Sequence, residues 1–193
     1  MANLKIISLD PIGAYNYQEA GILPELRIKG KTVFPVLNTQ TSLDVELKLI
    51  KSKVYNNHTM LIIKAEFGYI TLRIVDGKDA HLDVGLVSSE ILSMADSESD
   101  QLWVREYLED QYLLFAFCIK DDYQKQYSGL GKNLMNIAVE VCKFIGVETF
   151  RLHCDETKHY PSGSFYSRWG ITEGIQYQLG DIKTFSTAVT EKQ

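Results

Sequence analysis

The feature that most constrains the fold of this chain is an apolar segment followed by a glycine turn and an amphipathic helix. Residues 112–119 (YLLFAFCI) have the composition and length of a strand that is covered on both faces. Residues 132–145 (KNLMNIAVEVCKFI) carry apolar side chains at helical spacing, and Gly146 follows as a C-terminal cap. The segment QYSGLGK, residues 126–132, connects the two. This order predicts a helix that starts at the end of a central strand.

The connecting turn has features of an anion-binding site. The first turn of a helix has unpaired N–H groups and a partial positive charge, and glycine lets an anion approach the backbone. Gln126, Ser128 and Lys132 add side-chain donors. Two interpretations are open at this point: the turn holds a pyrophosphate, or it only starts a helix. The Gly-x-Gly-x-x-Gly dinucleotide motif is not met, because Leu134 stands where its third glycine would be.

The sequence before the apolar segment predicts an antiparallel meander. Apolar and polar residues alternate at positions 43–49, which is the period of a half-buried strand. Similar apolar stretches occur at 61–63, 70–75 and 82–87, with turn residues at 56–57, 67–68 and 76–77. Short helices are predicted after Asp10-Pro11, at Ser88–Met94 and at Asp100–Glu109.

The sequence after the amphipathic helix predicts a strand, a short helix and a hairpin. Apolar residues alternate at positions 149–154, Ser164–Trp169 has the pattern of the helix, and Gly180-Asp181 predicts a tight turn between two final strands. We therefore expect a single domain over residues 1–193, with a strand-rich amino-terminal half (1–110) and a second half (111–190). The predicted fold class is α+β.

Composition and charge argue against several classes of function. The formal net charge of −5 argues against non-specific nucleic-acid binding. No apolar run reaches the roughly 18 residues that span a bilayer, and the first residues lack the plan of a signal peptide, so we expect no membrane association and a cytoplasmic location. The three cysteines lack a CxxC or Cys/His spacing, so no metal site is predicted. The acidic segment 96–122 is either a solvated face or a surface that attracts a cationic substrate.

Two motifs in the second half resemble one known family. The segment QYSGLG at 126–131 resembles the Gln/Arg-x-x-Gly-x-Gly/Ala signature with which the GNAT superfamily of acyl-CoA-dependent N-acyltransferases binds the pyrophosphate of coenzyme A. The segment FYSRWGI at 165–171 resembles the Phe-Tyr-x-x-x-Gly-Phe-like sequence that follows the fifth strand in that family. The resemblance covers residues 112–190 and implies a GNAT-like, mixed and mostly antiparallel central sheet flanked by helices, with a divergent amino-terminal half.

The resemblance also implies a role for individual residues. The pyrophosphate of acetyl-CoA would bind at the turn, to Gln126, Ser128, Gly129, Leu130, Gly131 and Lys132. The pantetheine arm would pair with the backbone of the preceding strand, at Phe117, Cys118 and Ile119, where one N–H would face the thioester carbonyl. Tyr166 would be the general acid that protonates the leaving thiolate. The implied activity is transfer of an acetyl group from acetyl-CoA to a primary amine of a small molecule or protein.

The sequence departs from the family pattern in three places. The segment 120–125 is longer than the usual turn, His159 replaces a usual asparagine, and the amino-terminal half lacks the helices that normally form the acceptor site. The general base is not assigned among the residues at the strand ends: Glu109, Asp110, Asp121, Asp122, His153, Asp155 and Glu156. These departures leave two other hypotheses open, an acyl-CoA-binding regulatory or protein-interaction module without transferase activity, and a purely structural turn. A homo-oligomer is also left open.

Overall fold

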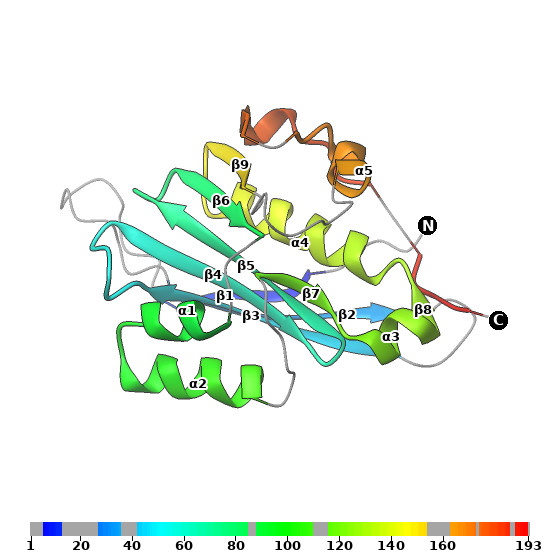
Figure 1. Cartoon of the computed structure of the whole chain (residues 1–193), viewed down its shortest axis with the longest axis horizontal. Coiled ribbons are helices and arrows are strands. Elements are labelled where there is room, and N and C mark those ends of the chain that lie inside the picture. The colour runs from blue at the N-terminus through cyan, green and yellow to red at the C-terminus, as the bar shows by residue number, and fades with distance from the viewer. Residues whose placement is uncertain are drawn as a thin grey trace.

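A computed structural model describes most of the chain, and it has an α+β fold with a mostly antiparallel open sheet and few helices (Figure 1). The described residues are 6–12, 27–35, 42–84, 88–109, 116–153, 163–172, 174–185 and 188–192. The strands of the main sheet are β1 (Ile6–Ile12), β2 (Arg27–Pro35), β3 (Ser42–Lys51), β4 (His58–Ala65), β5 (Gly68–Val75), β6 (Asp79–Asp83), β7 (Phe117–Ile119), β9 (Thr149–His153) and β10 (Gln176–Gln178). The described part contains no helix that is long and apolar enough to cross a membrane.

The meander predicted for the first half is confirmed. Strands β3, β4, β5 and β6 follow one another as antiparallel neighbours, and the turn at Asp76–Gly77 has positive φ at both residues. Alternating residues of these strands enter two different hydrophobic clusters. Leu61 and Ile63 pack in the cluster that contains helix α4 (Leu130–Phe144). Met60 and Ile62 pack in the cluster that contains residues of helices α1 (Ser88–Met94) and α2 (Glu98–Glu109). The sheet is therefore covered on both faces, which explains why residues 60–63 of β4 and most of β5 are apolar.

Two separate strands share one edge of β5. Strand β6 pairs with Arg73–Val75 of β5, and β7 pairs with Gly68–Ile70. The chain leaves the sheet after β6, forms α1 (Ser88–Met94) and α2 (Glu98–Glu109), and returns as β7. Both helices lie where the sequence predicts them. Figure 1 shows them on the side of the sheet away from α4.

The sheet opens beside β7. Strand β9 follows α4 and pairs in parallel with β6 along its whole length, and the backbone N–H of Val84 extends this ladder by donating to the carbonyl of His153 at 2.7 Å. In the described part of the chain, β7 has no strand neighbour other than β5. Among the described residues, a notch thus separates β7 from the end of β9.

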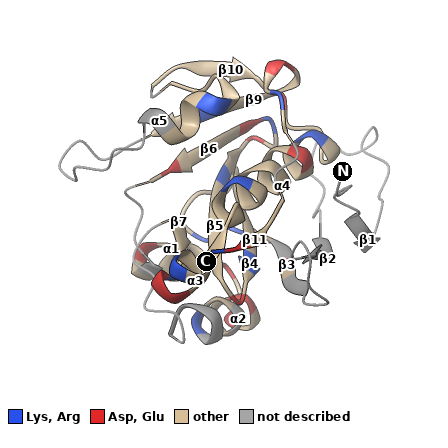
Figure 2. Ribbon diagram, turned by 90° about the vertical axis from the view of Figure 1, so that its right-hand side faces the viewer, with Lys and Arg blue, Asp and Glu red and all other residues tan. Residues whose placement is uncertain are grey.

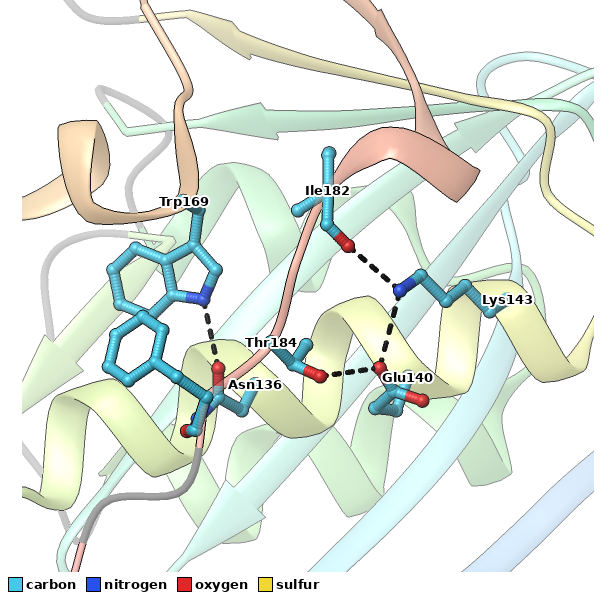
Figure 3. A network of polar contacts seen from close by, with 7 residues as sticks. Asn136, Glu140, Lys143, Trp169, Ile182 and Thr184 are labelled. Carbon is cyan, nitrogen blue, oxygen red and sulfur yellow. Dashed lines mark hydrogen bonds and ion pairs between the residues drawn. The ribbon is translucent and has the colours of Figure 1, made fainter.

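Hydrogen bonds join the segments around Trp169 and at 182–185 to α4 (Figure 3). The indole N–H of Trp169 donates to the side-chain carbonyl of Asn136 at 2.9 Å, and the amide of Asn136 donates to the backbone carbonyl of Phe185. Two turns further along α4, Lys143 donates to the carbonyl of Ile182 at 2.8 Å. Because Asn136 and Trp169 are buried, this hydrogen bond fixes the short helices that carry Trp169 against α4.

The structure corrects three local predictions. Asp10 and Pro11 lie within β1, paired with β2, so they do not begin a helix; the residues after Ile12 lie outside the described part. The long connection after β7 is not an extended turn but a helix, α3 (Asp121–Gln126). Gly180 and Asp181 belong to a 3-10 turn, η2 (Leu179–Asp181), that follows β10, and the last strand, β11 (Thr190–Glu191), pairs with β8 (Tyr127–Ser128) instead of with β10.

We expect Gly68→Ala to lower the free energy of unfolding by about 2 kcal/mol. Gly68 has φ of 154°, and a Cβ there would lie 2.2 Å from the backbone carbonyl oxygen of Cys118, so β5 and β7 would be forced apart. Urea denaturation measures the change. Gly180→Ala is the matched control, because its Cβ would meet no atom within 4 Å. Equal stability of the two variants would contradict the close β5–β7 contact.

Candidate functional site

Helix α4 begins at a left-handed glycine. Gly129 is the N-cap residue with φ of 87°, a conformation that costs glycine little and other residues more. Its carbonyl accepts from both the backbone N–H of Asn133, at 3.1 Å, and the side-chain amide of Asn133, at 2.9 Å. In the described part of the chain nothing accepts a hydrogen bond from the backbone N–H groups of Leu130, Gly131 or Lys132. These donors are therefore available to a ligand.

The residues before Gly129 are held by the end of the chain. Strand β8 pairs with β11, and the hydroxyls of Ser128 and Thr190 are hydrogen-bonded to each other. The backbone N–H of Lys192 donates to the carbonyl of Gln126 at 2.8 Å. Figure 2 shows the carboxyl terminus beside α3 and β11. A second cation, Lys192, is thereby brought to the same turn as Lys132.

The outer edge of β7 presents backbone groups to the notch. The carbonyl of Ala116 accepts from Thr71, and the N–H of Lys120 donates to the carbonyl of Phe67, so these alternate residues face β5. In an antiparallel pair the residues between them, Phe117 and Ile119, direct their N–H and C=O groups away from β5. Among the described residues, no backbone group pairs with these N–H groups.

Side chains of α5 (Gly163–Tyr166) close the notch on the far side. The ring of Tyr166 is 6.4 Å from that of Phe117 and meets the ring of Phe165 edge-on at 5.0 Å. Tyr166 is 3% exposed, and the following turn is anchored on α4 by Trp169. The phenol is thus held in a fixed position beside the start of β7.

These elements enclose one cavity of about 630 Å³, a size typical of small-molecule sites. Its wall contains most of the residues that the resemblance implies: Phe117, Cys118, Ile119, Ser128, Gly129, Leu130, Gly131, Lys132 and Tyr166. Gln126 is not in the wall; its exposed side chain donates to the hydroxyl of Tyr127 at 3.0 Å. The structure therefore brings together the strand end, the glycine turn and the tyrosine, but not the leading glutamine.

Gly131 faces the space between α4, β7 and α5. A Cβ at Gly131 would lie 3.7 Å from side-chain atoms of Phe117, Ile119 and Phe165. These are ordinary contact distances, so an alanine would fit without distortion and would point into the space between α4, β7 and α5. A longer side chain at this position would fill the cavity.

Sequence reasoning assigned no role at the site to five further wall residues: Val84, Gln124, Tyr127, Phe165 and Lys192. Phe165 and Tyr127 lie within the recognised motifs, and their aromatic character was a usable signal. Val84 and Lys192 carry no such signal, because only the β6–β9 and β8–β11 pairings bring them to the site.

The cysteines of the described part are unsuited to covalent catalysis. Burial raises the pKa of the Cys142 thiol to about 12. Burial, with a smaller effect of the Asp121 carboxylate, also raises the pKa of Cys118. The thiolate is the reactive form, so both side chains are poor nucleophiles at neutral pH. Cys118 packs against the cluster of α1 and α2, and only its strand position places it at the cavity.

The candidate bases are distributed unevenly around the cavity. Asp121 lies in its wall with an exposed carboxylate, and Asp122 is exposed on the same helix. His153 ends β9 on the face of the sheet away from α4. The structure does not describe the side chain of Glu109, nor the residues Asp110, Asp155, Glu156 and His159. Asp121 is therefore the carboxylate that the described part places at the cavity.

Comparison of the chain with protein-family models, with curated proteins and with solved structures finds no match. The resemblance to N-acyltransferases therefore rests on the motifs at 126–131 and 165–171 and on the arrangement of the residues around the cavity.

We expect iodoacetamide at pH 8 to leave Cys142 unmodified in the folded protein and to alkylate Cys118 more slowly than in the urea-unfolded protein. With a pKa of about 12, only about one Cys142 thiol in 10⁴ is ionised at that pH. Mass spectrometry of tryptic peptides resolves the individual sites. Rapid alkylation of Cys142 under native conditions would be inconsistent with the packed inner face of α4.

Proposed function

We propose that this protein is an N-acetyltransferase that transfers an acetyl group from acetyl-CoA to a primary amine of a small molecule or protein. The observation that carries the proposal is one cavity whose wall joins three elements: the N–H groups of Leu130, Gly131 and Lys132, which have no acceptor among the described residues, the outer edge of β7, and the side chain of Tyr166. Acyl transfer from a coenzyme thioester needs these three components in this order: an anion site, a groove for an extended arm and a proton donor near the sulfur.

The start of α4 would hold the pyrophosphate. Three backbone donors at a helix N-terminus favour an anion, and Lys132 and Lys192 add positive charge to the same wall. Left-handed Gly129 lets the chain turn sharply into the helix without a Cβ beside the anion. The overall negative charge of the protein does not oppose this, because a local cluster of donors determines anion binding.

The edge of β7 would hold the pantetheine arm. An extended arm with amide groups can pair with an exposed strand edge in the same way as an added strand. Phe117 and Ile119 supply the outward N–H and C=O groups. Because Tyr166 lies beside Phe117 and the anion site lies beyond Ile119, the thioester end belongs near Phe117. The N–H of Phe117 is therefore the best-placed donor to the carbonyl oxygen, where negative charge develops.

The chain's own groups would then act as follows. Acetyl-CoA supplies a thioester whose carbonyl carbon is attacked by the neutral acceptor amine, with cleavage of the C–S bond. The Tyr166 hydroxyl donates a proton to the departing sulfur, and a base at the acceptor side takes the proton from the amine nitrogen. Transfer is direct, because the raised pKa values of Cys118 and Cys142 make an acyl-cysteine an unfavourable route.

We expect Tyr166→Phe to lower kcat by roughly 10²-fold or more while the affinity for acetyl-CoA stays the same. The phenyl ring keeps the packing against Phe117 and Phe165, and the variant lacks the hydroxyl that would donate the proton. Thiol release from acetyl-CoA measures the rate across a panel of polyamines, aminoglycosides and lysine peptides, and calorimetry measures the affinity. Tyr123→Phe is the matched control, because Tyr123 lies on α3 and outside the cavity wall.

The outcomes separate the hypotheses. Acetyl-CoA binding without thiol release for any amine would favour a regulatory acyl-CoA-binding module. Absence of binding at millimolar acetyl-CoA would contradict both the transferase and the acyl-CoA-binding module. The glycine turn would then have only a structural role. Full activity of Tyr166→Phe would contradict the role of Tyr166 as general acid. The proposed binding site for acetyl-CoA would not be affected by that result.

A further inference from the structure

A second group of chemically reactive side chains lies on the opposite face of the sheet. In the parallel β6–β9 pair, Asp83 is the register partner of His153, and His81 lies two residues before Asp83 (Figure 2 shows the two strands side by side). Their neighbours Leu82 and Leu152 are buried in the cluster that contains α4. Since successive side chains of a strand alternate between faces, His81, Asp83 and His153 project to the other face.

We propose that His81, Asp83 and His153 form a binding site for a divalent transition-metal ion of the zinc class. Each residue offers one ligand atom, and the three atoms lie within 4.8 Å of one another. Zinc binds imidazole nitrogen and carboxylate oxygen at about 2.0–2.2 Å, which places such ligand atoms roughly 3.3 Å apart. Small side-chain rotations close the difference, because all three residues are only half-buried. This proposal is independent of the acyltransferase function.

The state of His81 supports a missing ligand. Its Nδ1 atom is buried and has no hydrogen-bond partner among the described residues. A buried polar atom without a partner is unfavourable, and an ion or a water molecule can complete it. The Nδ1 atom of His58 is in the same state, so it is the position of His81 beside Asp83 and His153 that points to an ion. The His81 and His153 rings are 5.2 Å apart between centroids and tilted by 36°, which is not a stacked arrangement that would explain the pair by itself.

Arg73 contacts both oxygens of the Asp83 carboxylate and holds it in place. Its Nε lies 2.9 Å from one oxygen of Asp83, and its Nη2 donates to the other oxygen at 3.3 Å. Carboxylate ligands of metals are commonly oriented by such outer contacts, and each oxygen keeps a second lone pair for the ion. The guanidinium charges of Arg73 and of Arg151, the register partner of His81 on β9, oppose a bound cation, so we expect no more than micromolar affinity. Two imidazoles and one carboxylate favour zinc, cobalt or nickel and disfavour calcium and magnesium, which need more oxygen ligands.

Calorimetric titration of the full-length protein with Zn²⁺ tests the site. We expect one ion per chain with micromolar affinity, no binding of Mg²⁺, and an affinity at least about tenfold lower in His81→Gln and in His153→Gln. His58→Gln is the matched control. His58 is half-buried on β4, which is separated from β6 by β5, and it is not one of the three ligands, so the Zn²⁺ affinity of this variant should equal that of the wild type.

A second measurement uses only the wild-type protein, so it does not require that the variants fold. Co²⁺ added to the wild-type protein should give the visible absorption of a low-coordinate nitrogen and oxygen site, and Zn²⁺ should shift the ring resonances of His81 and His153 in NMR spectra. Absence of saturable Zn²⁺ binding, unchanged affinity in both ligand variants, or a strong thiolate-to-cobalt band that indicates cysteine ligands would each overturn the proposal.

Discussion

The sharing of one edge of β5 between two strands is the constraint on which the site depends. Strand β6 pairs with the second half of β5 and also with β9, whereas β7 pairs with the first half and has no further strand neighbour in the described chain. If one long strand replaced β6 and β7, β9 could pair with that whole strand, and the edge that β7 exposes would be covered. The excursion through α1 and α2 therefore leaves the notch into which α4, α5 and the edge of β7 direct their groups.

The notch also explains why polar groups remain unpaired there. Leaving a buried backbone donor without a partner costs about 1–3 kcal/mol, and a whole domain is stable by only about 5–15 kcal/mol. Five such donors, from Phe117, Ile119, Leu130, Gly131 and Lys132, are tolerable only where water or a ligand can reach them. The cavity provides that access. The surrounding contacts, from Gly68 against Cys118 to Trp169 on Asn136, keep the donors directed at the same space.

Local sequence patterns predicted much of this arrangement. The amphipathic period of α4, with Gly146 ending it, placed the helix within two residues, and the alternation at 149–153 placed β9. The glycine turn and the second aromatic motif pointed to residues that the structure brings to one cavity. Each of these signals is carried by residues close together in the chain.

Some features of the site depend on pairing between distant strands, which local sequence patterns do not predict. The parallel β6–β9 pair joins residues some seventy positions apart, and it creates both the end of the notch and the group of His81, Asp83 and His153, for which no local ligand spacing exists. The β8–β11 pair likewise brings in Lys192. Asp10-Pro11 has the pattern of a helix start, but pairing with β2 overrides that local preference.

Amide chemical shifts measured during titration with coenzyme A test the central claim most directly. Binding should shift the amides of Leu130, Gly131 and Lys132 together with those of Phe117 and Ile119, because the helix start and the strand edge line the same cavity. Inorganic pyrophosphate, which lacks the arm, should shift the helix amides alone. If coenzyme A leaves the amides at the start of α4 unchanged, or shifts only residues elsewhere, the proposed anion site at this turn is contradicted.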